Sequence, residues 1–207
     1  MSEHSEIIFK MPNNRIIELC IQLGDITKTS TEAIVNAAHS KLSCGGGVDG
    51  AIHKAAGSCL LDECLGLPLN KDGNRCEIGE AKITLGYNLP SKYVIHTVAP
   101  SFVGSSKIEN GKKIYISNDP KISDLLSSCY RNCLILANSR GIKTLAFPSL
   151  GTGGHSFPVE LAAKIAIDST LNTAEYQLDP LLIETIVFVL FSKFDYDEYK
   201  KALWERK

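Results

Sequence analysis

The 207-residue sequence has no long hydrophobic run, and its positive and negative charges almost cancel. The longest apolar stretch lies near residues 183–191, well short of the roughly 20 residues that a membrane-spanning helix needs. Twenty-two lysines and arginines face 23 aspartates and glutamates, and the basic residues are scattered. The sequence therefore excludes a membrane span and offers no basic stripe for nucleic-acid phosphates, so we expect neither partner.

The seven cysteines include no C-x-x-C pair, and their number is odd. This pattern argues against a disulfide framework and against a structural zinc site, so we expect reduced thiols, no metal and no cofactor. The first 14 residues are polar and lack the apolar segment of a secretory signal. We expect an intracellular protein, cytoplasmic or nuclear, that acts as a monomer.

Strand-like and helix-like segments alternate along the chain. Six apolar segments rich in β-branched residues predict strands at 16–23, 33–37, 82–85, 93–98, 144–148 and 184–191. Segments with helical periodicity predict helices at 48–65, 122–138, 158–171 and 195–204. Alternation of this kind is typical of an α/β fold, and near-continuous apolar strands indicate a sheet with helices on both faces.

We therefore predict a single domain over residues 15–207, preceded by a polar N-terminal segment, 1–14. Its fold class is α/β, with three layers (α/β/α) around a central mixed six-stranded sheet. Residues 67–77 and 103–120, which are rich in polar and turn-forming residues, are predicted to be surface insertions.

Two glycine-rich loops each follow a predicted strand and precede a predicted helix. The first begins Cys-Gly-Gly-Gly-Val-Asp-Gly at Cys44, and the second reads Ser-Leu-Gly-Thr-Gly-Gly-His over 149–155. Glycines let backbone amides approach a ligand, and the start of a helix favours negative charge. Because α/β sheets bind ligands at the carboxyl ends of their strands, we predict that the two loops hold a diphosphate between them.

Two other phosphate-binding motifs fit less well. Residues 45–50 match G-x-G-x-x-G, but residues 39–44 separate them from the preceding strand, and no acidic strand end lies at the Rossmann distance. Neither loop has the Lys-Ser or Lys-Thr that follows the glycines of a P-loop.

Five motifs, in order, resemble the macrodomain family: Leu-Gly-Asp-Ile-Thr at 23–27, Ala-Ile-Val-Asn-Ala-Ala at 33–38, Gly-Gly-Gly-Val-Asp-Gly-Ala-Ile-His at 45–53, Tyr-Val-Ile-His-Thr at 93–97 and Phe-Pro-Ser-Leu-Gly-Thr-Gly-Gly at 147–154. The resemblance covers residues 16–203. It implies an ADP-ribose cleft at the carboxyl ends of the central strands, with ADP-ribose or ADP-ribosylated proteins as partners. The first glycine loop resembles the MacroD-type hydrolase branch, whereas the second is more similar to reader macrodomains.

The resemblance also implies which residues bind the ligand. Asp25 would accept a hydrogen bond from the adenine amino group beside the Ile26 amide, and Phe191 would pack on adenine. The residues implied around the diphosphate are Gly46, Gly47, Val48, Gly50, Ser149, Gly151, Thr152, Gly153 and Gly154. His155 would lie beside the distal ribose. A capping role for Asp25 and a core position for Phe191 remain alternatives.

Three residues carry the catalytic hypothesis that the resemblance implies. Asp49 matches a carboxylate that holds the water attacking the distal ribose, and Asn36 matches an asparagine near that ribose. His39 stands where the family usually has a second asparagine. His53 and His96 are predicted to be structural.

Three functions follow as alternatives. The first is hydrolysis of ester-linked mono-ADP-ribose, on protein Asp or Glu or on acetylated ADP-ribose, with Asp49 positioning the water. The second is a non-catalytic reader that binds ADP-ribose or ADP-ribosylated proteins. The third, a zinc-assisted hydrolase, needs a ligand set that Cys44 and His39 alone do not supply.

Overall fold

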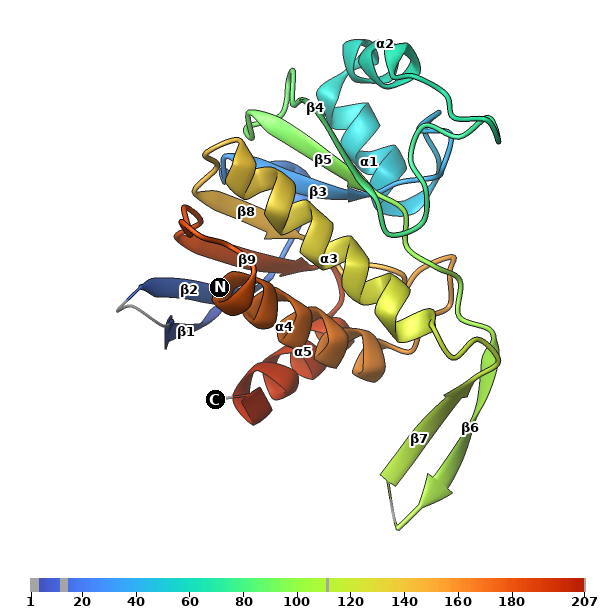
Figure 1. Cartoon of the computed structure of the whole chain (residues 1–207), viewed down its shortest axis with the longest axis vertical. Helices are drawn as coiled ribbons and strands as arrows, with labels where there is room; N and C mark the ends of the chain where they lie inside the picture. The colour runs from blue at the N-terminus through green and yellow to red at the C-terminus, as the bar shows by residue number, and fades with distance from the viewer. Residues whose placement is uncertain (1–3, 12–14, 111, 207) are drawn as a thin grey trace.

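The computed structural model describes residues 4–11, 15–110 and 112–206, and it is built around one seven-stranded sheet (Figure 1). The strand order is β1-β2-β9-β8-β3-β5-β4. The strands are β1 (His4–Lys10), β2 (Ile16–Leu23), β3 (Ala33–Ala37), β4 (Ala81–Leu85), β5 (Tyr93–Thr97), β8 (Thr144–Phe147) and β9 (Thr185–Leu190). Because β1 and β4 pair antiparallel to neighbours that are otherwise parallel, the sheet is mixed, as predicted.

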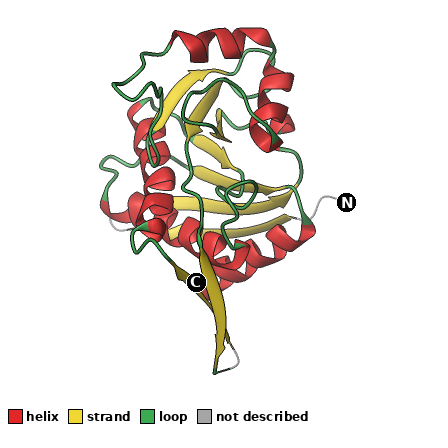
Figure 2. Ribbon diagram, turned by 90° about the vertical axis from the view of Figure 1, so that its right-hand side faces the viewer, coloured by secondary structure: helices red, strands yellow, loops and turns green. Residues whose placement is uncertain are grey.

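Helices cover both faces of this sheet (Figure 2). They are α1 (Gly47–Ala56), α2 (Ser58–Gly66), α3 (Ile122–Ser139), α4 (Val159–Tyr176) and α5 (Lys193–Arg206). Residues alternate between the two faces along each strand: Ile34 packs with α1 and α2, whereas Val35 packs with α3 and α4. The two hydrophobic cores confirm the predicted three-layer α/β/α class. No helix in the described ranges is long and apolar enough to span a bilayer.

The prediction of six strands was wrong by one. Within the N-terminal segment predicted to precede the domain, residues 4–10 form β1, which pairs with β2 at the edge of the sheet. Ile7 is buried there while Ile8 is 60% exposed, so the strand has one apolar face and one exposed face. Its few apolar residues alternate with polar residues over only a short stretch, so the sequence pattern did not predict a strand. The other parts of that segment, 1–3 and 12–14, lie outside the described residues.

The predicted helix at 48–65 is two helices. Gly57 separates α1 from α2 and has a φ of 87°, a left-handed value that glycine adopts without strain. Helical periodicity continues across this residue, so the pattern alone did not reveal the break.

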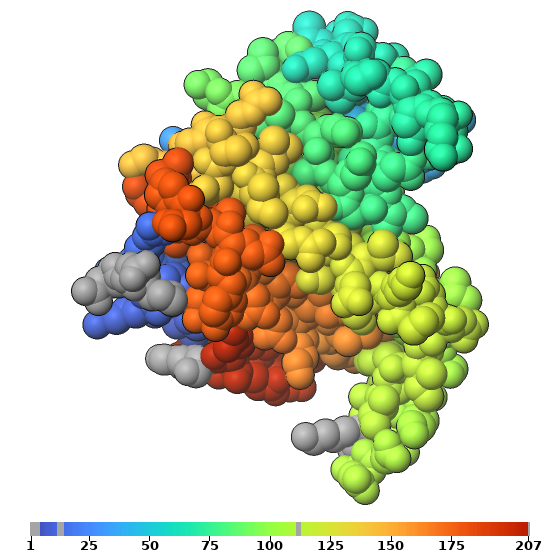
Figure 3. Space-filling model, in the orientation of Figure 1, coloured from blue at the N-terminus to red at the C-terminus, as the bar shows by residue number. Residues whose placement is uncertain are grey.

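The predicted surface insertion at 103–120 contains a β-hairpin of β6 (Gly104–Glu109) and β7 (Lys112–Ser117). It projects from the body of the molecule as the yellow-green arm of Figure 3. Tyr115 attaches it to α4 through a hydrogen bond of 2.8 Å to the Glu160 carboxylate. Every residue of β6 is exposed, so this part of the chain does lie on the surface.

The parallel strands bring both glycine-rich loops to one edge of the sheet. β3 and β8 are hydrogen-bonded neighbours, and β9 lies on the other side of β8. Because all three run in the same direction, the segments that follow them begin at the same edge. The fold therefore brings residues from 24 to 195 around one pocket.

Candidate functional site

A pocket of about 750 Å³ lies at this edge, within the size range of small-molecule sites. Of the residues predicted to bind or act on a ligand, the following line it: Asp25, Ile26, His39, Gly46, Gly47, Val48, Asp49, Ser149, Gly151, Thr152, Gly153, Gly154, His155 and Phe191. Asn36 and Gly50 do not. The fold thus brings together most of the predicted site from five separate segments.

The start of α1 forms one side of the pocket. Gly46 is the N-cap residue, and Gly47 has a φ of 59° that glycine tolerates well. The first amides of a helix have no partner within it, and the helix dipole adds partial positive charge there. This side of the pocket is therefore suited to bind an anionic group.

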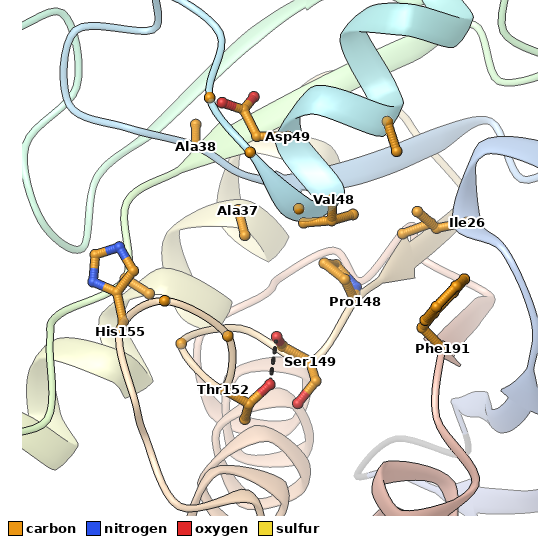
Figure 4. A pocket seen from close by; sticks show the side chains of 18 of the residues that line it. Ile26, Ala37, Ala38, Val48, Asp49, Pro148, Ser149, Thr152, His155 and Phe191 are labelled. Carbon is orange, nitrogen blue, oxygen red and sulfur yellow. Dashed lines mark hydrogen bonds between the residues drawn. The ribbon is translucent and has the colours of Figure 1, made fainter.

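The second glycine loop forms the opposite side. Figure 4 shows Val48 on the side of the cavity opposite Ser149 and Thr152, with Asp49 beyond Val48. The Thr152 hydroxyl donates to the Ser149 carbonyl at 3.2 Å, and the Phe157 amide donates to the Gly151 carbonyl at 2.9 Å. These bonds hold the loop in a tight turn, so the two glycine-rich segments face each other as the sequence predicts.

One end of the pocket is apolar. Phe191 is 87% exposed at the end of β9, and Figure 4 places its ring near Ile26. An aromatic ring this exposed at a pocket edge can stack against a flat ligand group. The carboxylate of Asp25 accepts from the Thr27 amide at 2.9 Å and from its hydroxyl at 2.7 Å. Asp25 therefore caps the short 3-10 helix η2 (Ile26–Lys28) and also lines the pocket.

Asp49 lies in the first turn of α1, and only 4% of the residue is exposed. Its Oδ1 accepts from Asn36 Nδ2 at 2.6 Å and lies 3.4 Å from His53 Nε2. A Cβ at Gly45 would come within 3.0 Å of its Oδ2, so the loop passes directly over the carboxylate. The carboxylate is thus fixed on two sides at the wall of the pocket.

Two predicted contacts need correction. Asn36 is fully buried, so it cannot contact a ribose in this structure; it binds Asp49 from behind. The Gly50 amide donates to the Gly46 carbonyl at 3.3 Å within the helix, so it is not free for a diphosphate. A Cβ at Gly50 would lie 2.7 Å from the Gly45 carbonyl oxygen. This glycine instead allows the loop to pack closely against α1.

His39 and His155, the histidines that line the pocket, make different contacts. His39 is exposed, and its Nδ1 accepts from the Lys41 amide at 3.3 Å. His155 Nδ1 lies 2.8 Å from the Ser101 hydroxyl, and its carbonyl accepts from the Phe102 amide at 2.8 Å. Figure 4 places His155 at the end of the pocket opposite Phe191.

The sequence interpretation missed two residues. His53 was predicted to be structural rather than catalytic, and its contact with Asp49, one helical turn away, was not predicted as part of the site. Asp195 in the first turn of α5 lines the pocket. Burial raises the pKa of its carboxyl, while a hydrogen bond with Ser192 acts in the opposite direction.

The described residues of the pocket indicate neither a reactive cysteine nor a cluster of metal ligands. Burial and the charge of Asp49 raise the pKa of the exposed Cys44 thiol, which disfavours the reactive thiolate. Within the described ranges, one group of possible metal ligands lies close together, Glu6, Glu18 and Cys20 on β1 and β2. None of these three residues lines the pocket.

The chain is similar to known proteins over most of its length. Residues 35–166 match the Macro domain family. A Macro domain-containing protein of Methanosarcina mazei is 46% identical over 180 residues, which are 87% of this chain and 84% of that protein. The ADP-ribose glycohydrolase MACROD2 of Homo sapiens is 44% identical over 184 residues, which are 88% of this chain but 38% of MACROD2.

Solved structures show the same similarity. An Oceanobacillus iheyensis macrodomain with ADP aligns with a TM-score of 0.78 at 35% identity, covering 99% of this chain and 97% of that one. A Trypanosoma brucei macrodomain in complex with ADP-ribose aligns with a TM-score of 0.73 at 34% identity, covering 89% of this chain and 68% of that one.

Proposed function

This chain belongs to the Macro domain family, and we propose that its pocket binds ADP-ribose and hydrolyses ester-linked mono-ADP-ribose. Relatives that include an ADP-ribose glycohydrolase and structures that hold ADP or ADP-ribose support the proposal. The observation that carries it is the position of Asp49, which lines the pocket while Asn36 and His53 fix its carboxylate from within.

In the proposed complex, adenine lies at the apolar end, between Phe191 and Ile26, with Asp25 accepting from its amino group. The diphosphate lies between the start of α1 and the second glycine loop, where backbone amides and the helix dipole favour negative charge. The distal ribose then lies toward His39 and His155. This order follows the pocket from its exposed aromatic end to its polar end.

In the proposed reaction, Asp49 orients a water molecule toward the anomeric carbon of the distal ribose. A bond forms between the water oxygen and that carbon, the bond from the carbon to the ester oxygen breaks, and the carboxylate of a protein Asp or Glu leaves. The water proton passes to Asp49 and then to solvent. Because Asn36 and His53 hold the carboxylate, much of the rate gain comes from orientation before reaction.

The proposed adenine contact can be tested at Phe191. Replacing it with alanine should weaken ADP-ribose binding roughly tenfold, since stacking of a base on an aromatic ring contributes about 1–3 kcal/mol. Isothermal titration calorimetry would measure the dissociation constant. Phe194→Ala is a matched control, because Phe194 is 56% exposed nearby but does not line the pocket. Equal affinities for the two variants would remove Phe191 from the site.

The test of the proposed function uses a protein carrying mono-ADP-ribose on a carboxylate side chain. We expect the purified chain to release ADP-ribose from it and to bind free ADP-ribose in calorimetry. Binding without release would favour the reader function instead. Loss of release on treatment with a chelator would favour the zinc-assisted class, and no heat of binding would contradict the proposal altogether.

A further inference from the structure

Four buried side chains form a continuous polar row from β4 to the pocket: Thr84, His96, Asn36 and Asp49. Thr84 Oγ1 lies 2.9 Å from His96 Nε2, and His96 Nδ1 lies 3.1 Å from Asn36 Nδ2. Asn36 Nδ2 in turn lies 2.6 Å from Asp49 Oδ1. Each of the four residues is at most 4% exposed, so water does not compete for these bonds.

The direction of every bond in this row follows from Asp49. An ionised carboxylate only accepts, so Asn36 must turn its NH₂ group toward it. The second hydrogen of the same NH₂ group then points to His96 Nδ1, which must be the acceptor. The imidazole proton is therefore on Nε2 and is donated to Thr84, with Cys64 Sγ 3.6 Å from the same nitrogen.

The orientation of the Asn36 amide depends on these partners alone. Its Oδ1 is buried and has no hydrogen-bond partner among the described residues. If the amide rotated by half a turn, its oxygen would face the Asp49 carboxylate and the carboxylate would lose its donor. Neutral His96 opposes this rotation because its bare Nδ1 would then face the amide oxygen as well.

We propose that His96 is a positioning residue for Asp49, acting through Asn36. It selects the amide orientation that donates to the carboxylate, and so holds Asp49 in its position at the wall of the pocket. Thr84 lies one step further back, where its hydroxyl oxygen accepts from the Nε2–H group. This inference rests on the proposed hydrolysis, and it assigns a catalytic consequence to a strand residue that does not line the pocket.

The kinetic test compares two substitutions of His96. His96→Leu removes the acceptor, and we expect kcat to fall roughly tenfold, the effect of one lost buried hydrogen bond, while KM and the affinity for ADP-ribose change less than about twofold. His96→Asn places a side-chain oxygen near the position of Nδ1 and should recover most of the lost kcat. Thr170→Val is the control for a change in the core, because Thr170 is buried in α4 and its hydroxyl has no hydrogen-bond partner among the described residues.

A second measurement does not depend on turnover. The ¹⁵N signals of the His96 imidazole should show a protonated Nε2 and a bare Nδ1. Equal loss of kcat in His96→Leu and His96→Asn, unchanged kcat in a folded His96→Leu, or a protonated Nδ1 in the wild type would each overturn the proposal. A wild type that binds ADP-ribose without releasing it would overturn the hydrolysis itself, whereas the imidazole signals report the row independently.

Discussion

Replacing Asp49 with alanine should lower kcat for release of ADP-ribose by at least about 100-fold, the usual scale for losing a positioned general base. Asp49 is the acidic residue in the first turn of α1, and it lines the pocket at the proposed ribose end. Affinity for ADP-ribose should change little, because the proposed diphosphate contacts are backbone amides. Single-turnover release would measure the effect on turnover, and calorimetry the effect on affinity. Circular dichroism would check that the variant is folded.

Asp124→Ala is the matched control for this substitution. Asp124 is also the acidic residue in the first turn of its helix, α3, but it is exposed and does not line the pocket. Its replacement should leave both turnover and binding unchanged. If Asp49→Ala kept its activity while His39→Ala lost it, the attacking water would have to be organised by His39 at the rim.

Lowering the pH from about 7 to about 4 should remove roughly 3 kcal/mol of folding free energy through His96 alone, at about 1.4 kcal/mol per pH unit. Burial, as the larger cause, and neighbouring His53 lower the pKa of His96 from 6.5 to about 3. The unfolded chain therefore binds a proton at His96 in this pH range, whereas the folded chain does not. This stability is fully present above pH 6.5 and is lost as the pH falls toward the folded pKa.

Urea unfolding of the wild type and His96→Asn at several pH values would measure this effect. The variant should be less stable at neutral pH but should lose less stability on acidification, so the two curves converge. His53, whose ring lies beside His96, and Glu80, whose pKa is lowered, are present in both proteins, so their contributions largely cancel in the comparison. Parallel curves would show that His96 does not titrate differently in the folded and unfolded chains.

The sequence predicted the elements that have a strong local signal. Strands 16–23 and 33–37 were predicted with the bounds that the structure has, because both are rich in apolar and β-branched residues. The two glycine loops were recognisable because glycine clusters between a strand and a helix are uncommon without a close backbone approach. β1, the β6–β7 hairpin and the helix break at Gly57 were missed, because their local sequence patterns are weak or ambiguous.

What the sequence by itself determined is therefore the layered α/β class, the family and most of the residues around the pocket. Only the tertiary structure decided the surroundings of Asp49: Asn36 lies behind it, and His96, 60 residues further along the chain, contacts Asn36. The physical reason is that hydrogen-bond partners depend on strand register. The parallel pairing that sets Asn36 opposite His96 is a property of the assembled sheet, and no local periodicity encodes it.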